Sequence, residues 1–165
     1  MKKLFVALMM VLPMTAFAQK FGHFDSAEVI QAMPEATTAQ NEIQAKAKTY
    51  EDELKRMQDE LRTKAEDYDK NAATLVDAVK QRREQELQDL NQRLQEYYST
   101  SQQELQQLQT QKMQEIQQKV LKAVEEVGQA GNYVYIMDTS SGIPFINKSL
   151  STDVTAQIKA KLGIK

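Results

Sequence analysis

The chain has no cysteine and no tryptophan among its 165 residues, and it contains a single histidine. Without cysteine it cannot form a disulfide bond, present a thiol nucleophile or bind a metal through thiolate. A lipid-anchored bacterial lipoprotein also needs a cysteine after its signal sequence, so we expect a soluble mature protein. The single histidine, His23, lies in a predicted strand, where we expect it to pack rather than to catalyse or to bind a metal.

Motifs for catalysis are missing as well. The sequence has no glycine-rich phosphate loop and no G-x-S-x-G nucleophile elbow. Asp138, Ser140 and Ser141 are residues that commonly fix turns by local hydrogen bonds, so we interpret them as turn residues rather than as a hydrolytic site. We therefore predict that the protein is not an enzyme, needs no cofactor and no metal, and does not use ATP.

Long hydrophobic runs are absent apart from one near the N-terminus. Lys2 and Lys3 precede an apolar run at residues 4–12, and Ala16-Phe17-Ala18 supplies a small-x-small cleavage site. This order is typical of a secretory signal peptide, and the run is well short of the roughly 20 residues that a spanning helix needs. We predict that residues 1–18 are cleaved and that the mature protein is secreted across the inner membrane.

An excess of positive charge is also lacking. The full chain has 21 basic and 23 acidic residues, so the loss of Lys2 and Lys3 leaves 19 basic residues against 23 acidic ones. A mildly acidic protein does not attract a polyanion, so we expect no nucleic acid as a main partner.

Glycine and proline are missing between Pro34 and Gly128, so nothing stops a helix over that stretch. Apolar residues recur there at steps of three and four, which predicts a coiled-coil seam. The seam consists of Ile43, Ala47, Tyr50, Leu54, Met57, Leu61 and Tyr68, then Leu87, Leu90, Leu94, Tyr97, Ser101, Leu105 and Leu108, and after a phase slip Met113, Ile116, Val120, Val124 and Val127. Fourteen glutamines between residues 81 and 118 are interleaved with it, and we interpret them as a soluble helix face.

This helical stretch forms either one rod, ~140 Å long at 1.5 Å per residue, or a hairpin. The seam lapses at residues 69–74, where Asp, Asn and Thr side chains can bond to the backbone, so we favour a hairpin with its tip near residues 69–75. Leu75, Val76 and Val79 follow the tip without seam partners.

The two ends of the mature chain have strand patterns. Phe21-Gly22-His23-Phe24 is an aromatic strand candidate, and Asp25-Ser26-Ala27-Glu28 has the spacing of a capping box that starts a short helix. Gly128 and Gly131 are expected to end the long helix before a strand at residues 132–138. Such end strands can meet only if the helices double back, which favours the hairpin.

The C-terminal part holds a second strand candidate at residues 143–147 and a last short helix capped near Thr152 or Asp153. In the strand at residues 132–138, alternation points Tyr133, Tyr135 and Met137 one way and Val134 and Ile136 the other, so both faces are apolar. We predict that this strand pairs with residues 21–24 and with Phe145-Ile146, and that other subunits complete its cover.

Three stretches together make the chain resemble the Skp family, also called OmpH-like proteins. They are FGHFDSAEVIQAMPE at residues 21–35, the Asp-Lys-Asn-Ala-Ala-Thr tip at residues 69–74, and NYVYIMDTSSGIPFINKS at residues 132–149, which leads to TDVTAQIKAKLGIK. The resemblance implies a homotrimeric periplasmic chaperone shaped like a jellyfish. In such proteins a β-rich body joins three subunits, and helical hairpins enclose unfolded outer-membrane proteins without ATP.

From the residues and the resemblance we predict a mainly α fold with a small β body. Residues 19–33 and 129–165 form the oligomerisation body, and residues 34–128 form a helical-hairpin tentacle. The body candidates are Phe21, Phe24, Val134, Ile136, Phe145 and Ile146. The client-binding candidates are Tyr68, Leu75, Val76 and Val79, for which ordinary packing at the hairpin end is the alternative.

One departure from the family is the charge. Its best-known members are strongly basic, whereas this chain is acidic and has only one adjacent arginine pair, Arg82-Arg83. We therefore do not expect lipopolysaccharide binding, and we expect membrane association to be peripheral at most. Two alternatives to a holdase for unfolded outer-membrane proteins stay open: a structural coiled-coil tether, and an accessory subunit of an envelope assembly complex.

Overall fold

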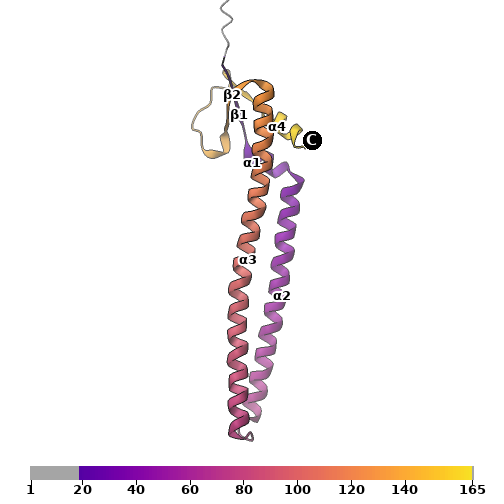
Figure 1. The fold of residues 1–165 in the computed structure, drawn as a ribbon, viewed down its shortest axis with the longest axis vertical. Coiled ribbons are helices and arrows are strands. Elements are labelled where there is room, and N and C mark those ends of the chain that lie inside the picture. Colours follow the sequence, from indigo (N-terminus) through magenta and orange to yellow (C-terminus); the bar gives the residue numbers. More distant parts are fainter. Residues whose placement is uncertain (1–18, 165) are drawn as a thin grey trace, which may run out of the picture.

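The molecule is a small body from which two long antiparallel helices extend (Figure 1). The computed structural model describes residues 19–164, so the predicted signal peptide lies outside the described residues. Helices α2 (Pro34–Asn71) and α3 (Asp77–Gly131) form the hairpin, which we call the arm. The predicted mainly α fold with a helical hairpin is confirmed, and the single rod is excluded.

The arm turns between residues 72 and 76, where side chains bond to the backbone. Asn71 Nδ2 donates to the carbonyl oxygen of Asp67 at 2.9 Å, and Thr74 Oγ1 donates to the carbonyl oxygen of Asn71 at 2.8 Å. Local bonds of this kind compete with helical pairing, which explains how the chain reverses without glycine or proline.

Few side chains of the arm are fully buried, because each helix of a two-helix hairpin has only one neighbour to cover its seam. Tyr50 and Ser101 are the buried residues near the middle of the arm. The rings of Tyr50 and Tyr97 meet edge to face with centroids 6.0 Å apart, and the Tyr50 hydroxyl donates to Glu104. Leu54, like most of the seam, is only half-buried.

Helix α3 continues through Gly128 and ends at Gly131, so the prediction that Gly128 helps to end it is wrong. Its cap is Asn132, whose φ of 52° lies in the left-handed region. Asparagine tolerates this conformation better than other non-glycine residues, so it can replace glycine as a helix C-cap.

The body contains a parallel three-stranded sheet in the order β2-β1-β3, formed by β1 (Lys20–Phe24), β2 (Tyr133–Asp138) and β3 (Ser151–Asp153). The chain leaves β1 through α1 (Ser26–Ala32) and returns from the arm into β2. Strand β1 is therefore central, whereas β2, which we expected to pair on both of its edges, is an edge strand.

The strand predicted at residues 143–147 is wrong, and so is its pairing with β2. This segment is a loop that follows the short 3-10 turn η2 (Thr139–Ser141), and the third strand is β3. Pro144 has no backbone N–H to give to a sheet. Strand β3 instead pairs with the second edge of β1, and just beyond it the N–H of Val154 donates to the carbonyl oxygen of His23 at 2.9 Å.

The side chains of β2 do not alternate strictly between the two faces of the sheet, because its pairing with β1 contains a register shift. Lys20 lies opposite Tyr133, but the next residue, Phe21, lies opposite Tyr135, so Val134 is an extra residue. As a result Tyr133 lies on the inner face with Ile136: a Cβ atom on Gly22 would lie 3.2 Å from the ring of Tyr133 and 3.0 Å from Ile136. The prediction that Tyr133 points the same way as Tyr135 is therefore wrong.

The core lies between the sheet, α1, α4 (Thr155–Lys161), the first turns of α2 and the last turns of α3. Asp25 caps α1 as predicted, since its Oδ1 accepts from the N–H of Glu28 at 3.0 Å. The core side chains are Phe24, Val29, Met33, Ala39, Ile116, Val120, Ala123, Val127, Val154 and Ile158. The body thus includes turns of α3 that we had assigned to the arm, which fixes the arm firmly at its base.

Candidate functional site

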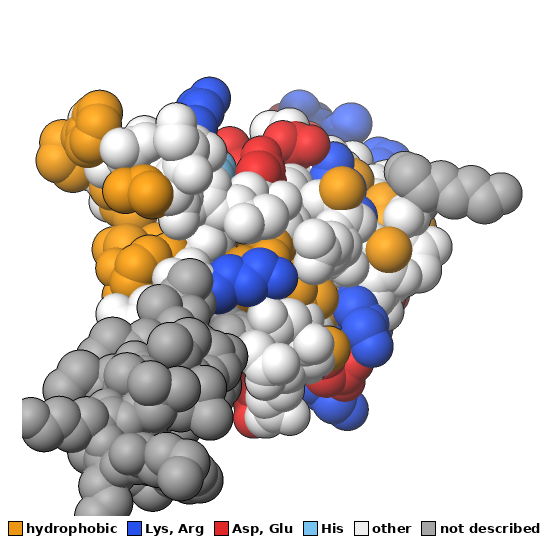
Figure 2. All heavy atoms as spheres, turned by 90° about the horizontal axis from the view of Figure 1, so that it is seen from above, with side chains coloured by type: hydrophobic (Ala, Val, Ile, Leu, Met, Phe, Trp, Pro, Cys, Tyr) orange, Lys and Arg blue, Asp and Glu red, His pale blue; other side chains and the backbone are white. Residues whose placement is uncertain are grey.

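Apolar side chains crowd the side of the sheet that faces away from the core. We call this surface, formed by Tyr135, Met137, Phe145 and Leu150, the outer apolar face, and the extra residue Val134 is exposed next to it on strand β2. Phe145 is 78% exposed and Val134 is 57% exposed. The aromatic ring of Phe21 packs against that of Tyr135, with the two ring centroids 4.8 Å apart. Seen from above, hydrophobic side chains gather on one side of the body (Figure 2). Exposed apolar patches of this kind mark interaction sites.

The predicted body residues divide between two environments. Phe24 and Ile136 face inwards and pack within the core of their own chain. Phe21 and Ile146 are half-buried, and Phe145 is exposed on the outer apolar face. The sequence pattern placed Tyr135 and Met137 on one apolar side of the strand without indicating them as body candidates, and it did not indicate Leu150.

The predicted client-binding residues lie at the tip of the arm, which is the end of the hairpin opposite the body (Figure 1). Val76 is 68% exposed and Val79 is 37% exposed, whereas Leu75 and Tyr68 are half-buried. The Tyr68 hydroxyl donates to Glu84 at 2.5 Å, and this bond to a carboxylate raises the pKa of Tyr68. The tip therefore offers only a small apolar area among charged residues.

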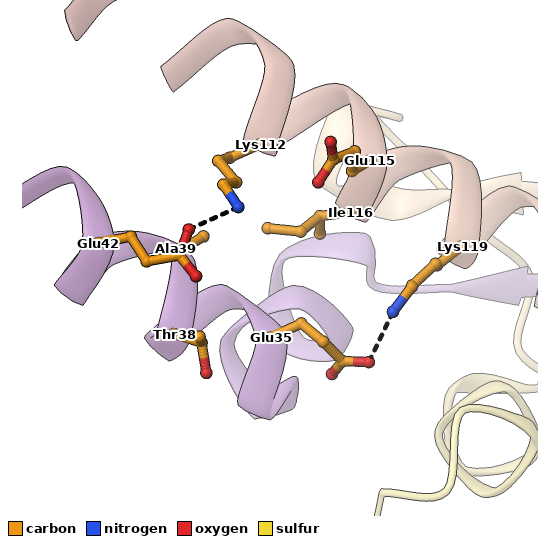
Figure 3. Close-up of a pocket in the computed structure, with 8 residues that line it drawn as sticks. All are labelled: Glu35, Thr38, Ala39, Glu42, Lys112, Glu115, Ile116 and Lys119. Atoms are coloured by element: carbon orange, nitrogen blue, oxygen red, sulfur yellow. Dashed lines mark hydrogen bonds and ion pairs between the residues drawn. The ribbon is translucent and has the colours of Figure 1, made fainter. Parts of the chain in front are cut away.

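A groove lined by charged residues, which we call the charged groove, lies between the helices near the base of the arm (Figure 3). Glu42 pairs with Lys112 at 2.5 Å, and Glu35 pairs with Lys119 at 3.0 Å. The Lys119 hydrogen bond lowers the pKa of Glu35, and the Glu42 bond raises the pKa of Lys112. The apolar side chains of Ala39 and Ile116 lie between these pairs. Such solvated pairs position α2 against α3 and add little stability.

Asp138 joins β2 to the start of α1. Its Oδ1 accepts from the N–H of Ser26 at 3.1 Å and from the N–H of Ser140 at 3.0 Å, and its Oδ2 accepts from Ser140 Oγ at 2.9 Å. Burial raises the pKa of Asp138, but these hydrogen bonds together outweigh burial and hold the pKa below its usual value. Asp138 and Ser140 therefore fix the turn after β2.

His23 is buried beside β3, with Nδ1 2.8 Å from Ser151 Oγ. Within residues 19–164 the structure contains no group of three or more His, Cys, Asp or Glu side chains placed to hold a metal ion. Among the helices described, none combines the length and the apolar character needed to cross a membrane.

Comparison with known proteins gives a family match and a structural match. A family model for outer membrane proteins of the OmpH-like type matches residues 20–162. A solved structure from Caulobacter crescentus CB15, described as an OmpH-like outer membrane chaperone, is similar with a TM-score of 0.75 and 16% identity. The match covers 87% of this chain and 83% of that chain, and at this identity it shows a shared fold. No curated protein matches the chain.

Proposed function

The chain belongs to the OmpH-like family of outer membrane proteins, and from this premise we propose that it is an ATP-independent periplasmic chaperone. It holds unfolded outer-membrane proteins between helical arms and prevents their aggregation before insertion. The observation that carries this proposal is the arm, which leaves the body as a hairpin with both flanks open to solvent (Figure 1). The chaperone description of the Caulobacter protein with this fold supports it.

The proposed assembly is a homotrimer joined through the outer apolar face. One arm cannot enclose a client, whereas three arms on one body form a cage. Strand β2 is the edge of the sheet, and exposed edges with apolar flanks are prone to pair with another chain. The exposed Val134 and Phe145 become buried in such a contact, which accounts for their position on the surface of one subunit.

The proposed mechanism needs no chemical reaction. Unfolded barrel proteins expose apolar strands that aggregate, and many weak contacts in one cavity keep client molecules apart while each contact releases readily. Tyr68, Leu75, Val76 and Val79 are proposed contacts at the arm tips. A long hairpin with few buried residues opens at low energetic cost, so the arms adjust to clients of different size.

Dilution of a urea-unfolded outer-membrane barrel with the purified mature protein tests this function. We expect light scattering by the aggregating barrel to be suppressed at a several-fold excess of trimer. Equal aggregation with and without the protein would contradict a holdase and would favour a structural tether, which needs the same arm but no affinity for clients.

A further inference from the structure

The two flanks of the arm base differ in chemistry. On one flank lies the charged groove, with its Glu35–Lys119 and Glu42–Lys112 pairs (Figure 3). On the other flank a second groove runs between α2 and α3, with a volume of about 590 Å³ against about 190 Å³ for the charged one. Its only charged lining residue is Lys112, which is engaged with Glu42 across the hairpin.

Carboxamide side chains line this second groove, which we call the amide groove. Five of them come from α1, α2 and α3, and they are Gln31, Gln40, Asn41, Gln44 and Gln109. Apolar side chains lie among them, chiefly Ile30, Ile43 and Met113. Met113 is 44% exposed, so the apolar part of the groove is open to solvent.

The uncharged surface continues along α3 towards the middle of the arm. Tyr98, Gln102, Gln109 and Met113 follow one another at steps of four, seven and four residues, which places them on one stripe of the helix. Between residues 97 and 114 the only charged side chains are Glu104 and Lys112, and both bond to α2. In a chain with 27% charged residues, this stretch of α3 is poor in charge on both of its faces. The amide groove differs from the opposite face because apolar side chains, Ile43 and Met113 among them, lie next to its carboxamides.

We propose that the amide groove and the adjoining stripe receive an extended, uncharged segment of the unfolded client. This inference rests on the proposed chaperone function and adds the surface and the kind of segment that it takes. A carboxamide offers two donors and an acceptor, so it can satisfy the unpaired N–H and C=O groups of an extended backbone whatever its sequence. Exposed methionine adapts to apolar side chains of varied shape.

The absence of charge is what selects this occupant. Strands of outer-membrane barrels present alternating apolar residues over about ten positions, with an apolar face for lipid. Docking such a strand against unpaired lysine or glutamate would cost the desolvation of a charge, whereas the one charged residue that lines the amide groove, Lys112, is already paired with Glu42. The paired charges on the opposite flank keep that side hydrated, so the arm has one client-facing flank and one solvent-facing flank.

Paired charge insertions test this surface. We compare Q44E/Q109E and Q44K/Q109K in the amide groove with Q107E/Q114E and Q107K/Q114K on the face of α3 turned away from α2. All four positions are exposed, and Glu and Lys are good helix formers, so we expect the helical circular dichroism to be unchanged. The measurement is the dissociation constant for a fluorescently labelled, urea-unfolded outer-membrane barrel.

We expect both groove variants, regardless of sign, to bind about tenfold more weakly than wild type, which corresponds to about 1.4 kcal/mol, and both controls to bind within about twofold. Groove variants that bind like wild type would overturn the inference while the holdase function stands, and so would weakening by one sign alone. If wild type itself binds no client, the proposed function fails. As a second measurement on an otherwise wild-type chain, a photo-crosslinker at Gln109 should capture the client and one at Gln114 should not.

Discussion

At the residue scale, Asp138 decides how the sheet is attached to the helices. Its carboxylate accepts hydrogen bonds from two backbone N–H groups, those of Ser26 and Ser140, which come from different elements. Ser26 is the first residue of α1, and its Oγ also lies 2.6 Å from Ser140 Oγ. One carboxylate therefore holds together the start of the helical part and the end of β2.

Replacement of Asp138 with alanine is expected to destabilise the body by about 1–3 kcal/mol, because the part-buried N–H of Ser26 and the exposed N–H of Ser140 lose their acceptor. Hydrogen exchange at the amides of β1 measures this, since those amides open with the body. D69A near the tip, where the carboxylate is exposed, is the control and should change protection little. Unchanged protection of the β1 amides in D138A would show that Asp138 does not stabilise the attachment of the sheet to the helices.

The same carboxylate predicts a pH dependence. The pKa of Asp138 is lowered as described above, and the pKa of Asp153 is lowered by its hydrogen bonds from Thr155. Both folded-state pKa values lie below the ordinary value of about 3.9, so their contribution to stability is present above that pH and is lost as pH falls through the folded values. We expect the urea midpoint of the body to be level between about pH 7 and pH 5 and to fall below about pH 4. The D138A/D153A variant should lose less stability on acidification than wild type, and an equal loss would rule out these two groups as its source.

At the element scale, the arm is a thin hairpin that depends on a few contacts. Tyr50 is the buried aromatic residue near its middle, where it meets Tyr97 and bonds to Glu104. Ser101, also buried there, donates to the carbonyl oxygen of Tyr97 at 2.5 Å. A small residue at a seam position makes room for the two rings, so this level of the arm is held by aromatic contact rather than by aliphatic packing.

Replacement of Tyr50 with alanine should therefore open the middle of the arm without disturbing the body. We expect the protection factors of the amides near residues 47–54 to fall by about tenfold or more, the result of losing about 1.4 kcal/mol or more of packing. Tyr98 is 56% exposed, so Y98A is a matched control that should leave these amides protected. A uniform loss of protection in arm and body would contradict the separation of the two.

The elements differed in how far their sequences predicted them. The helical arm follows from steps of three and four repeated along many turns, and the capping box at Asp25 follows from a local side-chain bond. The third strand could not be located, because residues 143–147 and 151–153 both suit a short extended segment and the free edge of β1 decides between them. The extra residue Val134 depends on pairing with β1, which sequence alternation does not contain.

The candidate sites show the same division. The exposure of valines at the arm tip could be predicted, because the pattern of apolar seam residues is interrupted there, and Val76 is indeed exposed. The amide groove could not be predicted from the sequence, because a glutamine-rich helix has the pattern of a solvent-exposed face. The groove becomes apparent only when the partner helix is placed against it. Gln44 and Gln109 are 65 positions apart (109 minus 44), and only the hairpin brings them into one groove.

At the scale of the whole molecule, the proposed association of the subunits belongs to the outer apolar face on the body, and the proposed client binding belongs to the amide groove on the arm. The face is built on the edge of the sheet, where a second chain can extend the pairing, and the groove lies between the helices at the arm base. Helix α3 connects them, because its last turns belong to the core of the body. In the proposed trimer the orientation of each arm is therefore set by how the bodies associate, so loss of association should also abolish the proposed cage.

The V134E/F145E variant tests that dependence. Charges placed on the outer apolar face at Phe145 and on the edge strand at Val134 must be desolvated in the proposed trimer, so we expect association to weaken by about 100-fold or more and the protein to sediment as a monomer at micromolar concentration. Its helical content should be unchanged, because Val134 and Phe145 are 57% and 78% exposed in the single subunit. V76E/V79E, with the same charge change at the arm tip, should sediment as wild type. The monomeric variant should also fail to suppress aggregation of an unfolded barrel at equal subunit concentration, since one arm cannot surround a client. A V134E/F145E protein that keeps the mass of the wild-type assembly would show that the subunits associate through another surface.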